Sequence, residues 1–85
     1  MGRGIHLQAA YKVAEDFEKT LTIKDFNGYI QVIHEEGTQM FFHCATARKW
    51  QKWYFIFPEH HDIHVYHEDE VQVCYFLKRE NIEEI

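Results

Sequence analysis

Residues 38–57 read T-Q-M-F-F-H-C-A-T-A-R-K-W-Q-K-W-Y-F-I-F, and this stretch decides the fold. Its aromatic and apolar residues predict one β-strand over Thr38–Thr46 and a second over Trp50–Phe57. A sheet with one solvated face should alternate apolar with polar residues, but these two strands are apolar on both faces. Both faces of the sheet must therefore be covered.

The second of these strands shows what has to be covered. Successive strand residues point to opposite faces, so we expect two sets of side chains. Trp53, Phe55 and Phe57 form one set, and Trp50, Tyr54 and Ile56 form the other. One helix can cover one face. Either a rolled-up barrel or a second chain must cover the rest, and we favour a partner surface as the more economical account.

The segments on the N-terminal side supply a helix and a further strand. Apolar residues with helical period predict an amphipathic helix over Gln8–Thr20. Tyr29–Glu35 is rich in β-branched residues and predicts a strand, which a tight turn at Glu36–Gly37 ends. Leu21–Gly28 has two interpretations: a single helical turn, or a hairpin turn.

The helical turn is the interpretation that we favour for this connection. Thr22 with Asp25 three residues later resembles a capping box, and Gly28 would end the turn. Asn27–Gly28 between apolar runs is the signal for the hairpin. The residues before it do not alternate cleanly, which argues against a strand there.

The remaining segments complete the predicted architecture. Ile63–His67 is expected to form a short fourth strand and Val71–Lys78 a fifth, followed by an acidic tail over residues 80–85. Short connections are typical of antiparallel meanders. We therefore predict a single α+β domain over residues 1–85: an amphipathic helix followed by a five-stranded antiparallel β-meander, packed as a sheet or curled into a small barrel. This layout resembles Sm-like and some SH3-like barrels in element order alone.

Composition limits the partners and the compartment. The 85 residues carry a formal net charge of -5, which disfavours duplex DNA and anionic membranes and is compatible with a basic protein partner. Cys44 and Cys74 lie in apolar runs, and we interpret them as buried free thiols in a reducing compartment. No signal peptide and no apolar run of about 18 residues is evident. These features predict a cytoplasmic protein without a membrane span.

Pro58–Glu70, which reads P-E-H-H-D-I-H-V-Y-H-E-D-E, suggests metal chemistry. Imidazole and carboxylate groups are ordinary ligands of divalent metals. The candidate ligands are His60, His61, Asp62, His64 and His67. On a strand, Asp62 and His64 would share a face and need a third ligand such as His43 or His34; on a helix, three of the histidines would align. The spacing matches no specific metal motif, so a polar hairpin tip is the competing interpretation.

Ala47–Tyr54 suggests nucleic-acid binding, because three cations alternate with aromatic residues. Arg48, Lys49 and Lys52 would contact phosphates, and the tryptophans would stack on bases. The competing interpretation is a loop that enters a core strand, with cations that protect an edge. The acidic net charge favours the second.

Catalysis has little support. The chain contains no serine, no glycine-rich phosphate loop and no activated nucleophile. We therefore expect no catalytic residues and no cofactor, apart from the metal alternative. The sequence favours a small interaction module that forms a homodimer or binds another protein. It also suits an inhibitor or accessory protein of a phage or mobile element. The expected contact residues are Trp50, Trp53, Tyr54 and Phe55.

Overall fold

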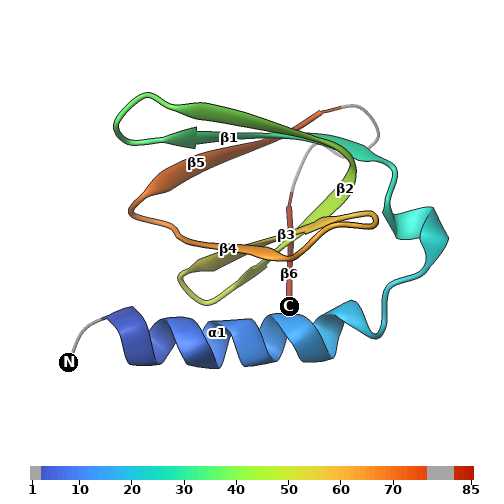
Figure 1. The fold of residues 1–85 in the computed structure, drawn as a ribbon, viewed down its shortest axis with the longest axis horizontal. Coiled ribbons are helices and arrows are strands. Elements are labelled where there is room, and N and C mark those ends of the chain that lie inside the picture. The colour runs from blue at the N-terminus through green and yellow to red at the C-terminus, as the bar shows by residue number, and fades with distance from the viewer. Residues whose placement is uncertain (1–2, 77–81) are drawn as a thin grey trace.

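A computed structural model describes residues 3–76 and 82–85, which form an α-helix, a short 3-10 helix and a six-stranded sheet (Figure 1). The helices are α1 (Arg3–Glu18) and η1 (Ile23–Asp25). The strands are β1 (Gly28–His34), β2 (Gln39–Trp50), β3 (Trp53–Pro58), β4 (His64–His67), β5 (Val71–Phe76) and β6 (Glu83–Glu84). The predicted α+β class is correct in outline.

The helix α1 begins earlier than residue 8 and ends before residue 20. Leu7 extends the apolar stripe by one turn toward the N-terminus and packs against the same cluster as Val13 and Phe17. Ala10 and Ala14 are fully buried. Their small side chains let the helix axis approach the sheet closely, because no bulky group separates the two backbones.

The favoured interpretation of residues 21–28 is confirmed, since η1 is a single helical turn. The Thr22 backbone N–H donates to Oδ2 of Asp25 over 2.8 Å, and the Asp25 N–H donates to the Thr22 carbonyl over 2.9 Å. These reciprocal bonds satisfy donors that a short helix otherwise leaves without partners.

The strand order β4-β3-β2-β1-β5 corrects the predicted five-stranded meander. Consecutive strands pair from β1 to β4, but β5 pairs with β1 and not with β4. Four strand spacings of a flat sheet would separate β4 from β5 by about 19 Å. The connection from His67 to Val71 spans at most about 14 Å. The sheet must therefore curl, as Figure 1 shows, and it remains open because β4 and β5 do not pair.

A bulge in β2 allows this curl. Gly28 pairs with Ala45 and Ile30 with Phe42, so β2 contains one extra residue between these pairs. Cys44 lies there with a φ of 52°, a left-handed conformation that is uncommon for residues other than glycine. The bulge turns the Cys44 side chain to the surface, so the prediction of a buried thiol at this position is wrong. The Cys74 side chain lies outside the described part of the structure.

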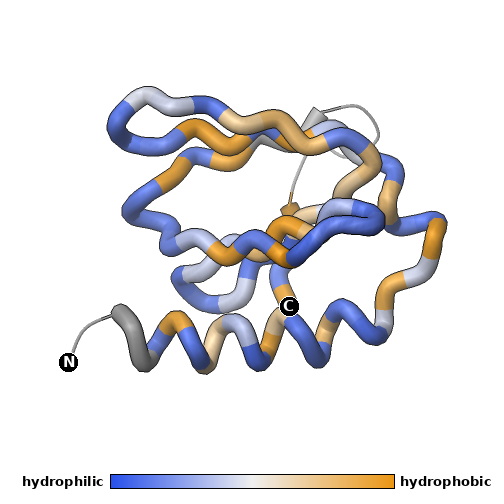
Figure 2. Tube along the Cα trace, in the orientation of Figure 1, coloured by the Kyte–Doolittle hydropathy of each residue, from blue (hydrophilic) through white to orange (hydrophobic). Residues whose placement is uncertain are grey.

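Two hydrophobic clusters cover the two faces of the sheet. The first lies inside the curl and contains Ile30, Val32, Phe42 and Ile56. The second lies between α1 and β3, and it contains Trp53, Phe55 and Phe57 together with the two buried alanines of the helix. In Figure 2, the strands contain both apolar and hydrophilic positions, whereas the loop after β3 is largely hydrophilic.

The chain itself therefore covers both faces of β3, the outer one with α1 and the inner one with the curl. A second chain is not needed for this purpose, which removes the argument that favoured a partner surface there. Trp50 also lies on the other side from the one predicted. It is the last residue of β2 and pairs directly with Trp53, so the two indoles share the helix-covered face.

Candidate functional site

The histidine-rich segment is spread over two faces and a loop. His60 and His61 are exposed on the loop after β3, and the His60 side chain is 85% exposed. His64 faces the interior of the curl, where its ring lies 4.8 Å from that of Phe42. His67 packs edge-on against Trp53 on the opposite face, with a centroid distance of 4.9 Å. Side chains of opposite parity along a strand point to opposite faces of the sheet, so His64 and His67 are separated from each other and from the loop histidines.

Asp62 is exposed and lies in the loop beside His61. Within residues 3–76 and 82–85, no three histidine, cysteine or carboxylate side chains are grouped so that they could bind one metal ion. His43, proposed as a neighbouring ligand, packs against Tyr29 with a centroid distance of 4.5 Å. His34 packs against Tyr66. The geometry thus gives no support to a metal centre in this segment.

His64 and His67 are the half-buried histidines of the segment, and only His64 lies inside the curl. Burial lowers the pKa of the His64 imidazole below the usual value, and the nearby Asp62 carboxylate offsets part of that effect. The Tyr66 hydroxyl lies 3.2 Å from Nδ1 of His64. The His64 ring, hydrogen-bonded to Tyr66 and packed against Phe42, therefore fits a structural role inside the curl.

The expected contact residues divide into buried and half-buried pairs. The Trp53 side chain is buried and that of Phe55 is fully buried, both under α1. Trp50 and Tyr54 are half-buried. Two of the four side chains therefore contribute to the core of the chain and are not on its accessible surface.

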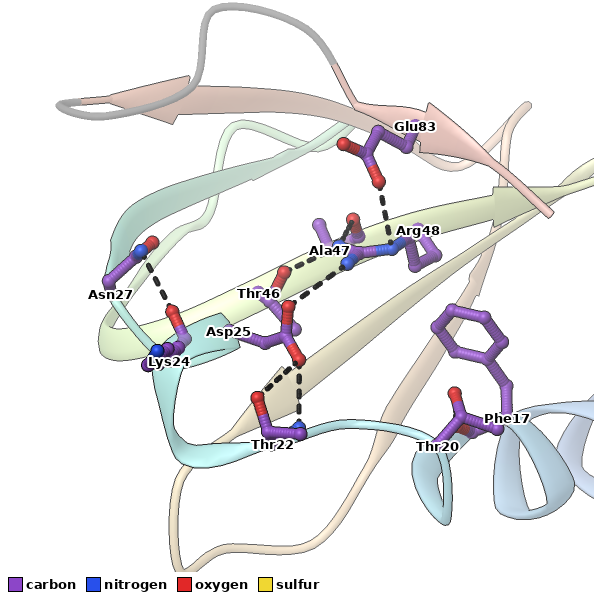
Figure 3. Close-up of polar contacts among 10 residues, drawn as sticks. All are labelled: Phe17, Thr20, Thr22, Lys24, Asp25, Asn27, Thr46, Ala47, Arg48 and Glu83. Carbon is purple, nitrogen blue, oxygen red and sulfur yellow. Dashed lines mark hydrogen bonds and ion pairs between the residues drawn. The ribbon is translucent and has the colours of Figure 1, made fainter.

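Arg48 lies within β2 and not in a loop, and its guanidinium is buried (Figure 3). Its side chain donates hydrogen bonds to Oγ1 of Thr46 and to the Ala47 carbonyl. Carboxylates lie on two sides of it, with Asp25 at 3.8 Å and Glu83 at 3.5 Å. This guanidinium is neutralised inside the chain and is not available to a phosphate.

The other two cations of the predicted nucleic-acid surface differ from each other. The ammonium group of Lys49 lies 3.0 Å from Oε1 of Glu68 and 5.4 Å from the centroid of the Tyr54 ring. The hydrogen bond to Glu68 is the main reason why the pKa of Lys49 is raised. Lys52 is exposed in the turn between β2 and β3. The three cations therefore form no common surface for a nucleic-acid backbone.

One concave surface of the described chain is an open groove of about 950 Å³. It lies between the second half of α1, η1 and the loop that follows β3. We call it the acidic groove, because carboxylates of Glu15, Glu18, Glu59 and Asp62 line it, and no lysine or arginine does among the described residues. Its apolar lining includes Leu21, Phe26, Pro58, Ile63, Tyr11 and Ile23.

Two of the apolar side chains in this groove are strongly exposed. Ile23 is 78% exposed and Tyr11 is 39% exposed. Sequence reasoning missed both residues. A usable signal existed in α1, where Tyr11, Glu15 and Glu18 recur at helical spacing along one side of the buried stripe. Ile23 carried no signal of its own, because a single apolar residue in a short turn is common.

A smaller groove of about 470 Å³ lies on the other side of the same loop. Its lining includes Phe41, His43, His61 and His64. Phe41 is half exposed and packs against Tyr29 on the outer face of β1 and β2. Imidazoles thus line this groove on several sides without converging on one point.

Comparison with known proteins identifies no relative: no protein-family model, no curated protein and no solved structure matches the chain. Among the described residues, no helix has the length and apolar character needed to span a bilayer.

Proposed function

We propose that this protein is a non-catalytic interaction module that binds a basic segment of a partner protein in the acidic groove. The observation that carries this proposal is the composition of the lining. Four carboxylates surround exposed apolar side chains, and none of the described lining residues is a lysine or arginine. The binding function follows the interpretation of the sequence, but the contact residues lie elsewhere.

Charge selects the kind of partner. Glu15 and Glu18 project from α1, and Glu59 and Asp62 come from the loop on the other side. Carboxylates on two walls of a concavity concentrate the negative potential, which attracts cationic groups and raises their association rate. The net charge of -5 acts in the same direction at longer range.

Apolar contact would supply most of the affinity. Ile23 and Tyr11 are exposed, and removing apolar surface from water contributes about 25 cal/mol per Å². Tyrosine is also enriched among residues that dominate interface energetics. A partner segment with an aliphatic or aromatic residue between lysines or arginines would satisfy both kinds of lining.

Peptide selection on the intact chain tests the proposal. We expect peptides enriched in lysine, arginine and large apolar residues, with affinity that decreases as salt increases. Glu18→Lys should weaken the binding of a selected peptide by about tenfold, as expected for loss of a close opposite charge at an interface. Ile23→Ser, which removes apolar surface without changing the charge, should weaken it as well.

Glu36→Lys is the matched control, because it makes the same charge change in the turn between β1 and β2, outside the groove. It should leave the affinity within about twofold, because Glu36 does not line the groove and solvent screens the interaction of exposed charges that are not in contact. Equal losses for Glu18→Lys and Glu36→Lys would show that net charge alone matters and would refute the groove.

A further inference from the structure

The strand β6 pairs with the part of the β2 edge that lies beyond the end of the pairing with β1. β3 pairs with one edge of β2 from Ala45 to Trp50. On the other edge, β1 pairs only as far as Ala45, because the bulge bends β2 away from it. β6 continues along that edge in parallel, with Glu83 opposite Arg48. The tail therefore acts as an added strand on a preformed edge.

Three kinds of contact hold this added strand. Ile82 packs against the cluster inside the curl. The Glu83 carboxylate lies 3.5 Å from Nε of Arg48, although the Glu83 side chain itself is 63% exposed. The Ile85 backbone N–H donates to the Lys49 carbonyl over 2.8 Å. An aliphatic residue, an adjacent acid and a backbone hydrogen bond thus define what this edge recognises.

The receiving side is organised independently of the tail. Arg48 is also held by Asp25 and by hydrogen bonds to Thr46 and Ala47, so its guanidinium stays oriented toward the edge (Figure 3). Pairing with β3 keeps β2 extended along the same residues. By contrast, β6 is only two residues long. A short strand on a rigid edge is an exchangeable occupant.

We propose that this edge of β2 is a second binding site, which takes an extended segment of a partner protein carrying an aliphatic residue followed by glutamate. β6 is the internal occupant and competitor of that segment. Binding adds a strand to the sheet, a recurring mode of peptide recognition in which backbone bonds give affinity and side-chain pockets give specificity. This site is independent of the acidic groove and of the proposal made for it.

The test uses the intact chain and a labelled peptide with the sequence of residues 82–85, I-E-E-I, between flanking glycines. Glu83→Ala and Glu83→Gln remove the carboxylate of the internal strand and should increase the affinity for the peptide about tenfold, because the tethered competitor is weakened. Fluorescence polarisation measures the affinity, and the Lys49 and Trp50 amide resonances report the place of binding. Circular dichroism confirms that each variant is folded.

Glu84→Ala is the matched control, since it removes the neighbouring exposed carboxylate, which does not face Arg48 in the pairing register. It should change the peptide affinity much less than the Glu83 variants do, because the Glu84 carboxylate interacts, among the described residues, only with the partly exposed Lys49. A peptide with glutamine in place of its first glutamate should bind at least about tenfold more weakly. The proposal is overturned if that peptide binds equally well, or if no Glu83 variant binds the original peptide. A concentration-dependent dimer of the Glu83 variants would assign the edge to a second copy and overturn the proposed partner.

Discussion

Segments 48–55 and 59–62 carry the cations and tryptophans and the adjacent histidines that suggest candidate sites, and the fold places most of their side chains in opposite environments. In the first segment, Arg48, Trp53 and Phe55 are buried, and the charge is neutralised by carboxylates from η1 and β6. In the second, His60, His61 and Asp62 are exposed in a loop. Residue types that suggest binding thus build the core in one segment and line grooves in the other.

The difference follows from strand pairing. A segment between two paired neighbours loses access to solvent on its edges, and packing layers then cover its faces. β2 and β3 are in that position, whereas the loop after β3 has no neighbour on its outer side. Function is therefore more readily placed on the loop and on the helix that faces it. Four predictions test this contrast.

The largest effect is expected for Phe55→Ala. The Phe55 side chain projects from β3 and is fully buried under α1. Its truncation should lower the free energy of unfolding by about 3–5 kcal/mol. Phe41→Ala is the matched control, because Phe41 is half exposed. It should cost less than about 1 kcal/mol. Urea unfolding followed by circular dichroism measures both, and similar losses would contradict the assigned layers.

Arg48→Ala should have the next largest effect, at about 2–3 kcal/mol, because it leaves the Asp25 and Glu83 carboxylates without their buried partner. The expected loss of stability is at the low end for buried ion pairs, because the Asp25 and Glu83 side chains both keep contact with water. Arg48→Met should cost less, because it keeps the aliphatic stem. Lys52→Ala should stay within about 0.5 kcal/mol. A stability loss for Lys52→Ala equal to that of Arg48→Ala would remove the distinction between buried and exposed cations.

Substitutions of Cys44 test the bulge, and we expect them to change the free energy of unfolding by about 1 kcal/mol. Its φ of 52° costs about 1–3 kcal/mol for residues other than glycine. Cys44→Gly relieves that strain, and it should be neutral or stabilising by about 1 kcal/mol after the entropic cost of glycine. Cys44→Val should be destabilising, because β-branched residues tolerate positive φ poorly. Thermal unfolding of the three proteins ranks them, and a valine variant more stable than the glycine variant would argue against the bulge.

The smallest effect concerns pH and His64. Burial lowers the pKa of His64 in the folded state, so the unfolded chain binds the proton more readily. Stability is therefore complete above the unfolded pKa, near 6.5, and is lost as the pH falls from there toward the lower folded pKa. His64→Gln should reduce this slope between pH 7 and 5.

His60→Gln provides the control, since His60 is exposed in the loop, and it should leave the pH dependence of stability unchanged. Urea midpoints at several pH values measure the slope for each protein. An unchanged slope in His64→Gln would show that other groups account for the acid sensitivity.

The helix, the single turn at residues 22–25 and the sequence positions of the main strands followed from local patterns. These features depend on side-chain periodicity and capping, which neighbouring residues specify. The predicted strand ended at Thr46, whereas β2 continues to Trp50; Ala47 has low strand propensity, and two cations follow it. The structure shows why alanine is there: Ala45 and Ala47 are fully buried where β2 bends, and larger side chains would not fit inside the curl.

The residues of the candidate site could not be predicted from the sequence in the same way. The acidic groove combines Glu15 and Glu18 of α1 with Glu59 and Asp62 of a distant loop, and no local pattern connects these positions. The interpretation of residues 50–55 as an accessible aromatic face did not anticipate that α1 covers Trp53 and Phe55. Whether an aromatic residue contributes to the core or to an interface depends on what packs against it.

The amino-acid sequence by itself determined that this chain contains an amphipathic helix and strands that are apolar on both faces, so that both faces require cover. Only the tertiary structure decided that α1 covers the outer face, that the curl covers the inner one, and that β5 and β6 pair with β1 and β2. The physical reason is the sequence separation over which each kind of interaction acts. Periodicity and propensity act over a few residues, whereas strand pairing and burial are chosen by contacts between segments that the sequence places far apart.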